Sequence, residues 1–190
     1  MRDKRHHFLN IVRPHLTEHR YTHTVGVLQT AVSLCVQFGG DQEVIETAAI
    51  LHDIAKFWSG DRLKESIIHY KLKQDLLDYD KETWHGPVGA EYVRTELGIT
   101  DDRILNCIRN HTVGSVQMST EEKIIWLADY IEPGRHFPGV DEVRELAKQD
   151  LNAALLFAID RTILFLLKQR KKVYPDTFLA RNWLLDNMKI

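Results

Sequence analysis

Four residues in three separate stretches have the types that bind a divalent metal ion: His23, the adjacent pair His52 and Asp53, and Asp129. Two neutral imidazoles supply nitrogen ligands and two carboxylates supply charged oxygen ligands, which leaves coordination positions open for water and substrate. A metal ion held in this way polarises a phosphoryl oxygen and lowers the pKa of a water molecule toward neutrality. The four residues therefore predict a metal site suited to hydrolysis of a phosphate compound.

Asp53 and Lys56 are the expected catalytic residues. Asp53 directly follows the predicted ligand His52 and precedes Lys56 by about one helical turn. One carboxylate oxygen of Asp53 can bind a metal ion while the other orients water or a second metal ion. Lys56 offers a point charge to a phosphate oxygen. Because phosphoryl transfer depends mostly on positioning and charge neutralisation, these residue types are sufficient for it.

Helical spacing places the candidate residues on apolar faces, where ionisable groups are costly unless they are paired or bound to metal. His52, His85, His111 and Asp129 share a face with Ala48, Val88, Ile108 and Ile125, respectively. Several such groups are best explained together if they converge on one cation. Taken alone, each has a simpler explanation: Asp129 pairs with Arg135, and Lys56 is a solvated lysine.

The elements that must position these residues are predicted to be helices. Apolar residues recur at spacings of three and four, whereas alternating strand patterns and hairpin signals are scarce. Gly39 predicts a helix end, and Ser119 with Glu122 predicts a capping box. The stretch 151–170 is apolar on most sides, which predicts a central buried helix. We predict an all-α fold, one domain over residues 1–190, with roughly eight to eleven helices.

Composition narrows the class of protein. The chain has 190 residues, is 44% hydrophobic and has a formal net charge of −2, so we expect a globular domain without a broad surface for nucleic acid. Cys35 and Cys107 are expected to be buried thiols and not a disulfide. The N-terminal segment lacks an apolar signal core and no apolar stretch is long enough to span a bilayer, so we expect a soluble cytoplasmic protein with no membrane partner. Three tryptophans, expected to be exposed, suggest a homodimer: Trp58, Trp84 and Trp183.

Several stretches resemble a known family. Arg20 to Thr24, Ala48 to Lys56 and the later Asp129 resemble the signature of the HD-domain phosphohydrolases. Four further stretches resemble the YqeK branch of that family, so that the similarity covers nearly the whole chain: His85 to Ala90, Arg109 to Thr112, Ala128 to Arg135, and Tyr174 to Asn182.

The resemblance implies an HD-domain helical bundle that is a symmetrical diadenosine tetraphosphate hydrolase, uses iron and releases two ADP. It implies that four residues ligate the first iron: His23, His52, Asp53 and Asp129. His85 and His111 would hold a second metal bridged by Asp53 or bind the scissile phosphates, and the sequence leaves both open. Phosphate oxygens would be contacted by Lys56, Thr112 and Arg135. The segment 172–177 would line the nucleoside pocket through Lys172, Val173, Tyr174 and Thr177, with Tyr174 as a stacking surface.

Some properties stay open at this stage. Mixed imidazole and carboxylate sites accept iron, manganese, cobalt or zinc, and one or two ions fit the candidate ligands. The HD signature also fits a 5'-nucleotidase or a cyclic nucleotide phosphodiesterase. A non-catalytic sensor of ADP-type nucleotides is a further alternative. The expected small-molecule partner is a dinucleoside polyphosphate or an ADP-type nucleotide, and the preference for adenine over guanine is not predicted.

Overall fold

The computed structural model describes residues 2–188, and every regular element in that range is helical. The α-helices are α1 (Arg2–Val12), α2 (Glu18–Phe38), α3 (Gln42–Leu51), α4 (Gly60–His69), α5 (His85–Glu96), α6 (Asp102–Asn110), α7 (Thr120–Ile131), α8 (Val140–Ala147), α9 (Leu151–Lys168) and α10 (Pro175–Asn187). Three short 3-10 helices lie between them: η1 (Arg13–His15), η2 (Gln74–Asp78) and η3 (Lys81–Thr83). For the described residues, the predicted all-α class and number of helices are confirmed.

Local capping signals determine where several helices begin and end. The Asp41 and Asp150 carboxylates accept backbone N–H groups in the first turns of α3 and α9. Ser119 and Glu122 form the predicted capping box at the start of α7. α2 ends at Gly39, which has a φ of +84°, a conformation that glycine adopts at little cost.

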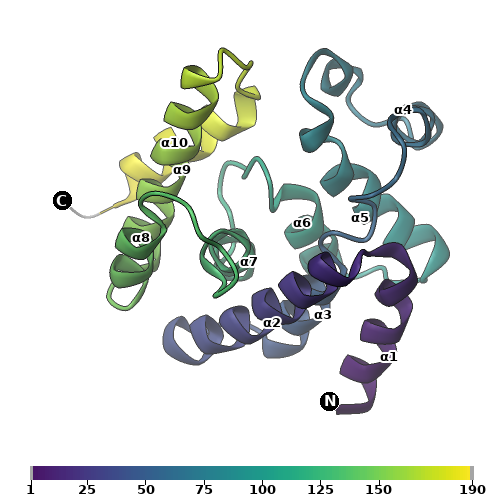
Figure 1. Cartoon of the computed structure of the whole chain (residues 1–190), viewed down its shortest axis with the longest axis horizontal. Coiled ribbons are helices and arrows are strands. Elements are labelled where there is room, and N and C mark those ends of the chain that lie inside the picture. The colour runs from purple at the N-terminus through teal and green to yellow at the C-terminus, as the bar shows by residue number, and fades with distance from the viewer. Residues whose placement is uncertain (1, 189–190) are drawn as a thin grey trace.

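The helices pack as two groups around α7. α2 packs against α3 and α7, α3 also contacts α6, and α6 lies beside α5. On the other side, α8 and α10 pack on α9, which itself contacts α7. Figure 1 shows α7 at the centre, the α8–α10 group to its left, and α4 and α5 to its right. This arrangement brings the C-terminal end of α7 near segments that are far away in sequence.

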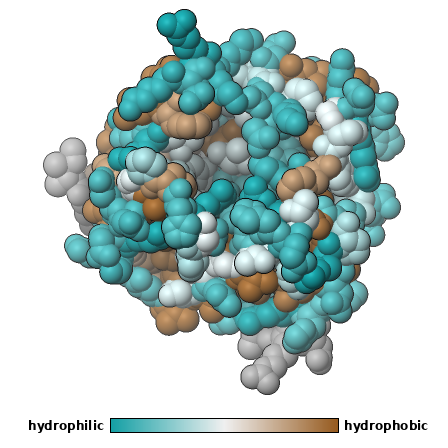
Figure 2. Space-filling model, viewed as in Figure 1, coloured by the Kyte–Doolittle hydropathy of each residue, from teal (hydrophilic) through white to brown (hydrophobic). Residues whose placement is uncertain are grey.

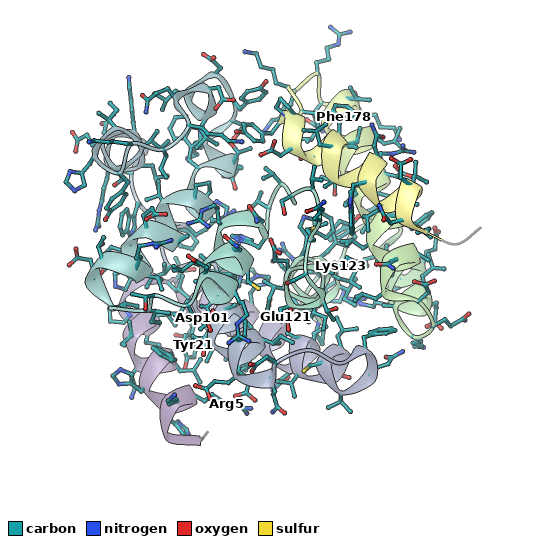
Figure 3. All side chains as sticks on the ribbon, turned by 180° about the vertical axis from the view of Figure 1, so that it is seen from behind. Arg5, Tyr21, Asp101, Glu121, Lys123 and Phe178 are labelled. Atoms are coloured by element: carbon teal, nitrogen blue, oxygen red, sulfur yellow. The ribbon has the colours of Figure 1, made fainter. Side chains whose placement is uncertain are left out.

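Partly buried polar links join helices at the periphery of the core. Arg5 of α1 donates to Glu46 of α3 at 2.6 Å, and the Glu121 carboxylate of α7 accepts the backbone N–H of Asp41 at 3.0 Å. Arg5 and Glu121 are labelled in Figure 3, which views the molecule from behind. These links fix α3, which carries the stretch leading to His52, against two other helices.

The prediction of a central buried helix over residues 151–170 is wrong. α9 buries only one face, and its C-terminal half leaves Leu164, Phe165 and Leu167 exposed to 54%, 59% and 55%. An apolar pattern does not distinguish a helix surrounded by protein from one whose apolar side chains border a cavity. Leu164 and Phe165 do line a cavity that is open to solvent, so part of this apolar surface borders that cavity and not a neighbouring helix.

Two further expectations are tested by burial. Cys35 and Cys107 are free, buried thiols, as predicted. Trp58, Trp84 and Trp183 are half-buried, so the expectation that they are exposed is wrong and they give no reason for a dimer. Trp84, for example, donates its indole N–H to the carbonyl of Leu76 at 2.7 Å. Within residues 2–188, no helix combines the length and apolar character that a membrane span requires.

Candidate metal centre

Two histidines are positioned by the same local hydrogen bond at the end of a helix. His52 directly follows α3, and His111 directly follows α6. The Nδ1 atoms lie 2.8 Å from the Ala49 carbonyl oxygen and 2.7 Å from the Ile108 carbonyl oxygen, respectively. A carbonyl only accepts, and last-turn carbonyls have no partner within the helix, so Nδ1–H must donate to them. Each ring therefore presents the lone pair of its Nε2 atom to the centre.

His23 is positioned by a residue that the sequence analysis did not single out. Its Nδ1 lies 2.9 Å from Oε1 of Glu132, and both side chains are buried. The other Glu132 oxygen accepts the backbone N–H of Gly134 at 2.6 Å. The carboxylate thus orients the His23 ring and leaves its Nε2 free, a common arrangement behind metal-binding histidines. The signal in the sequence was slight: Glu132 follows Asp129 by three residues, next to a predicted ligand.

Four potential ligand atoms converge from three parts of the chain. His23 Nε2 lies 3.0 Å from Asp129 Oδ1 and 3.9 Å from Asp53 Oδ2. His52 Nε2 lies 3.3 Å from Asp53 Oδ2 and 4.0 Å from Asp129 Oδ1. Ligand atoms that are each about 2.1 Å from one ion are separated from one another by roughly 3–4 Å. His23, His52 and Asp129 offer ligand atoms that all lie within 4.8 Å of one another, which is close enough to share a divalent cation. His52, Asp53 and His111 form a second set with this spacing.

Unpartnered polar atoms also indicate a cation. The Nε2 atoms of His23 and His52 and the Oδ2 atom of Asp53 are buried without a hydrogen-bond partner among the described residues. Arg20 places a guanidinium nitrogen 3.1 Å from Asp53 Oδ2, which contributes charge although it does not make a well-aligned hydrogen bond. Buried polar atoms that lack partners are destabilising, and a bound metal ion would satisfy all three.

A second group lies on the other oxygen of Asp53. His85 Nε2 is 3.1 Å and His111 Nε2 is 3.7 Å from Asp53 Oδ1, and the two Nε2 atoms are 3.0 Å apart. The Thr112 hydroxyl lies 3.1 Å from His111 Nε2. Burial lowers the pKa of His85 to about 4, so this imidazole is neutral near pH 7. Imidazole nitrogens beside a carboxylate oxygen fit either a second cation or a protonated phosphate oxygen.

The carboxylates at the centre are held in the ionised form. Burial opposes ionisation of Asp53, but the neighbouring histidines, His52 first among them, hold its pKa well below the usual range. Burial likewise opposes ionisation of Asp129, and the adjacent His23 imidazole together with the Arg135 charge holds that pKa well below the usual range. Arg135 donates to Asp129 Oδ1 at 2.6 Å. The ion pair between Asp129 and Arg135, which was the simpler explanation of Asp129, is therefore present as well.

The remaining predicted site residues differ in position. Lys56 forms an ion pair with Glu82 at 2.7 Å and is mostly buried, so it is not a solvated lysine. Thr112 and Arg135 line a cavity of about 610 Å³ that also borders His111 and Asp129. Thr112 and Arg135 therefore lie next to the metal centre, as the predicted phosphate contacts require.

The segment 172–177 lies apart from that cavity. Lys172 donates to the Asp78 carbonyl at 2.9 Å, and Val173, Tyr174 and Thr177 are partly or fully buried. Tyr174 is only 4% exposed and packs edge-on against Tyr79, so its ring has no free face on which a base could stack. The expected role of Tyr174 as a stacking surface therefore finds no support in its surroundings.

Gly86 allows the two histidines of the second group to approach each other. A methyl group added at Gly86 would lie 2.8 Å from the carbonyl oxygen of Arg109 and 3.1 Å from that of Ile108. Both contacts are with backbone near the end of α6, two and three residues before His111. The absence of a side chain at Gly86 therefore lets the start of α5, with His85, lie against the end of α6.

We predict that Gly86→Ala destabilises the protein by about 1–3 kcal/mol, because the added methyl group must push α5 away from α6. Turnover should fall as well, since His85 and His111 move apart. Urea unfolding of the metal-free protein measures the first effect. Gly60→Ala is a matched control because its methyl group would meet no atom within 4 Å. An unfolding midpoint for Gly86→Ala equal to that of Gly60→Ala would contradict this account of α5–α6 packing.

Comparisons with known proteins point to one family. Residues 20–134 match the model of the HD domain family. The chain is 52% identical to the protein of Bacillus subtilis (strain 168) named "Bis(5'-nucleosyl)-tetraphosphatase, symmetrical", over 94% of this chain and 96% of that protein. It is 51% identical to the protein of the same name from Halalkalibacterium halodurans, over 95% and 97% of the two chains.

A solved structure extends the similarity to the whole fold. It is the crystal structure of a predicted HD superfamily hydrolase from Clostridium acetobutylicum, described as involved in NAD metabolism. The TM-score is 0.91 and the identity is 37%, and the alignment covers 99% of this chain and 98% of the other. The similarity therefore includes all of the helices that carry the candidate ligands.

Proposed function

Because this chain belongs to the HD-domain family, in the branch of the symmetrical bis(5'-nucleosyl)-tetraphosphatases, we propose that it hydrolyses diadenosine tetraphosphate to two ADP. The relatives that carry this name match almost the full length of the chain. The observation that carries the proposal is the convergence of unpartnered ligand atoms from His23, His52 and Asp53 beside Asp129. A phosphoanhydride hydrolase needs a centre of this kind, whereas a packed helical core does not.

We propose that His23, His52, Asp53 and Asp129 hold the first metal ion. The bound ion would supply a Lewis acid for a phosphoryl oxygen and lower the pKa of the attacking water. Asp53 presents its second oxygen to His85 and His111, and we propose that these two histidines hold a second ion. The ligand types fit iron, as the family resemblance implies, and also manganese, cobalt or zinc. A metal analysis that finds two ions per chain would support this assignment, whereas one ion per chain would favour direct binding of phosphate by His85 and His111.

The protein's own cations fit a substrate with several negative charges. Arg135 is held by Asp129, and Arg20 lies next to Asp53, so both guanidinium groups lie at the edge of the centre. Lys56 is held by Glu82, and the Thr112 hydroxyl lies beside His111. These groups would orient the four phosphates and neutralise charge on the leaving ADP. In central cleavage, water attacks one of the two inner phosphorus atoms. The bond between that phosphorus atom and the central bridging oxygen breaks, which yields two ADP.

Product analysis tests this proposal. We expect the purified protein, supplied with iron or manganese, to convert diadenosine tetraphosphate into ADP as the only nucleotide product, measured by chromatography. AMP together with ATP would rule out central cleavage. Release of inorganic phosphate from a mononucleotide, or cleavage of a cyclic nucleotide, would favour the alternative phosphatase or phosphodiesterase. Tight nucleotide binding without any product would favour the non-catalytic sensor. Cytoplasmic location and a homodimer remain separate predictions.

A further inference from the structure

A cavity of about 610 Å³ begins at the metal centre and continues along the surfaces of α7 and α9. One end is bordered by His111, Thr112 and Asp129. The space lies between α7, the segment after it and the C-terminal half of α9. The face seen in Figure 2 is hollowed between the α8–α10 group and the α4–α5 part of the molecule. Cavities that bind small molecules have volumes of roughly 300–1,000 Å³, so this one is large enough for a nucleoside.

The walls of the cavity are rich in aromatic rings. Trp126 and Tyr130 of α7 lie nearly parallel with ring centroids 5.6 Å apart, and Phe137 meets Tyr130 edge-on at 5.0 Å. Phe165 and Leu164 extend the apolar surface from α9, although each is more than half exposed to solvent. Aromatic and aliphatic side chains left uncovered in this way mark a surface that binds an apolar group.

The polar groups of the cavity favour an anionic ligand. Three cationic side chains line it: Arg135, Arg161 and Lys168. Among the described lining residues, Asp129 is the only acidic one, and it is a proposed metal ligand. A flat ring system joined to phosphates would match the aromatic walls and the cationic side chains together.

We propose that this cavity binds one of the two nucleosides of the dinucleoside tetraphosphate, with its base against the aromatic wall and its phosphates directed to the metal centre. This inference rests on the proposed function and adds where one half of the substrate lies. The metal centre forms one end of the cavity. The phosphate chain of a nucleoside bound there therefore extends toward Arg135 and toward the metal ion that Asp129 would hold.

The other half of the substrate would then leave the centre on the side of His85 and Lys56. On that side, Lys172 of the segment 172–177 donates to the Asp78 carbonyl just before η3. Glu82 of η3 pairs with Lys56. The two chemically identical halves of the substrate therefore meet different protein surroundings, with the aromatic cavity serving one half only.

Filling the cavity from its open side tests the inference. Leu164→Trp places a large ring at a lining position of α9, whereas Leu167→Trp makes the same change three residues later, at an equally exposed position outside the lining. We expect Leu164→Trp to raise the KM for diadenosine tetraphosphate at least about tenfold, because base stacking contributes that much to nucleotide binding. Metal content should be unchanged in both variants, and Leu167→Trp should retain the wild-type KM.

The outcomes separate this inference from the proposed function. If the wild-type protein releases ADP and both tryptophan variants have the wild-type KM, the cavity does not bind the nucleoside and the proposed function stands. If the wild-type protein releases no ADP, the proposed function fails, and equilibrium binding of ADP to the same three metal-loaded proteins still decides the inference. Weaker or fewer bound ADP molecules in Leu164→Trp alone would support it, and equal binding in all three would overturn it.

Discussion

His52→Ala is expected to reduce turnover of diadenosine tetraphosphate at least about a thousandfold, because it removes a ligand from the centre of the proposed metal site. His52 is fully buried, and it belongs to both sets of residues that have the spacing to hold an ion: His23 with His52 and Asp129, and His52 with Asp53 and His111. Removal of this imidazole should therefore lower the affinity for both metal ions. The measurement is steady-state turnover together with metal content after dialysis.

The control for His52→Ala is His69→Ala, because His69 is an exposed residue at the end of α4 with no assigned role. The helical circular dichroism spectrum of His52→Ala should stay close to that of the wild type, since the core around it is built by α2, α3, α6 and α7. Substantial activity in metal-depleted His52→Ala protein would remove the metal mechanism. A loss of helical signal would instead show that His52 has mainly a structural role.

Asp53→Asn is expected to cause a loss of turnover of similar size with almost no change in side-chain volume. The two oxygens of Asp53 face two different groups of histidines, with Oδ1 at 3.1 Å from His85 and Oδ2 at 3.3 Å from His52. The amide removes the negative charge that two cations would share. We therefore expect both proposed ions to bind more weakly and the number of metal ions per chain to fall. Elemental analysis of dialysed protein measures this content directly.

Asp101→Asn provides a matched control for Asp53→Asn. Asp101 begins α6 by accepting the backbone N–H of Arg103 at 2.9 Å, and asparagine is an equally good residue at that position. Turnover and metal content of this variant should equal those of the wild type. If Asp53→Asn retained both metal ions and normal turnover, the proposed bridging role of Asp53 would be wrong.

The features that were predictable from the sequence depend on neighbours along the chain. Helical spacing located the inward faces that carry His52 and His111, and the capping box of Ser119 and Glu122 has the predicted partners. Residues one turn apart share a face in any α-helix, so their common orientation needs no knowledge of the tertiary fold. The types and order of the candidate ligands on these faces then led to the metal hypothesis, and the family resemblance added the substrate and the choice of iron.

The features that the sequence analysis missed depend on contacts between distant segments. Glu132 orients His23 across 109 positions of the chain, and Gly86 matters only because the end of α6 lies against it. The apolar pattern of α9 indicated burial, but Leu164 and Phe165 instead line a cavity. Neither local spacing nor amphipathicity specifies which side chains face an empty space, because that depends on how whole helices pack.

A metal-anomalous diffraction map of crystals grown with iron or manganese tests the central claim most directly. The account predicts a strong peak within bonding distance of His23 Nε2, His52 Nε2 and one oxygen each of Asp53 and Asp129. It further predicts a second peak between Asp53, His85 and His111. Catalytically active, metal-loaded crystals without a peak among the first four residues would contradict the account.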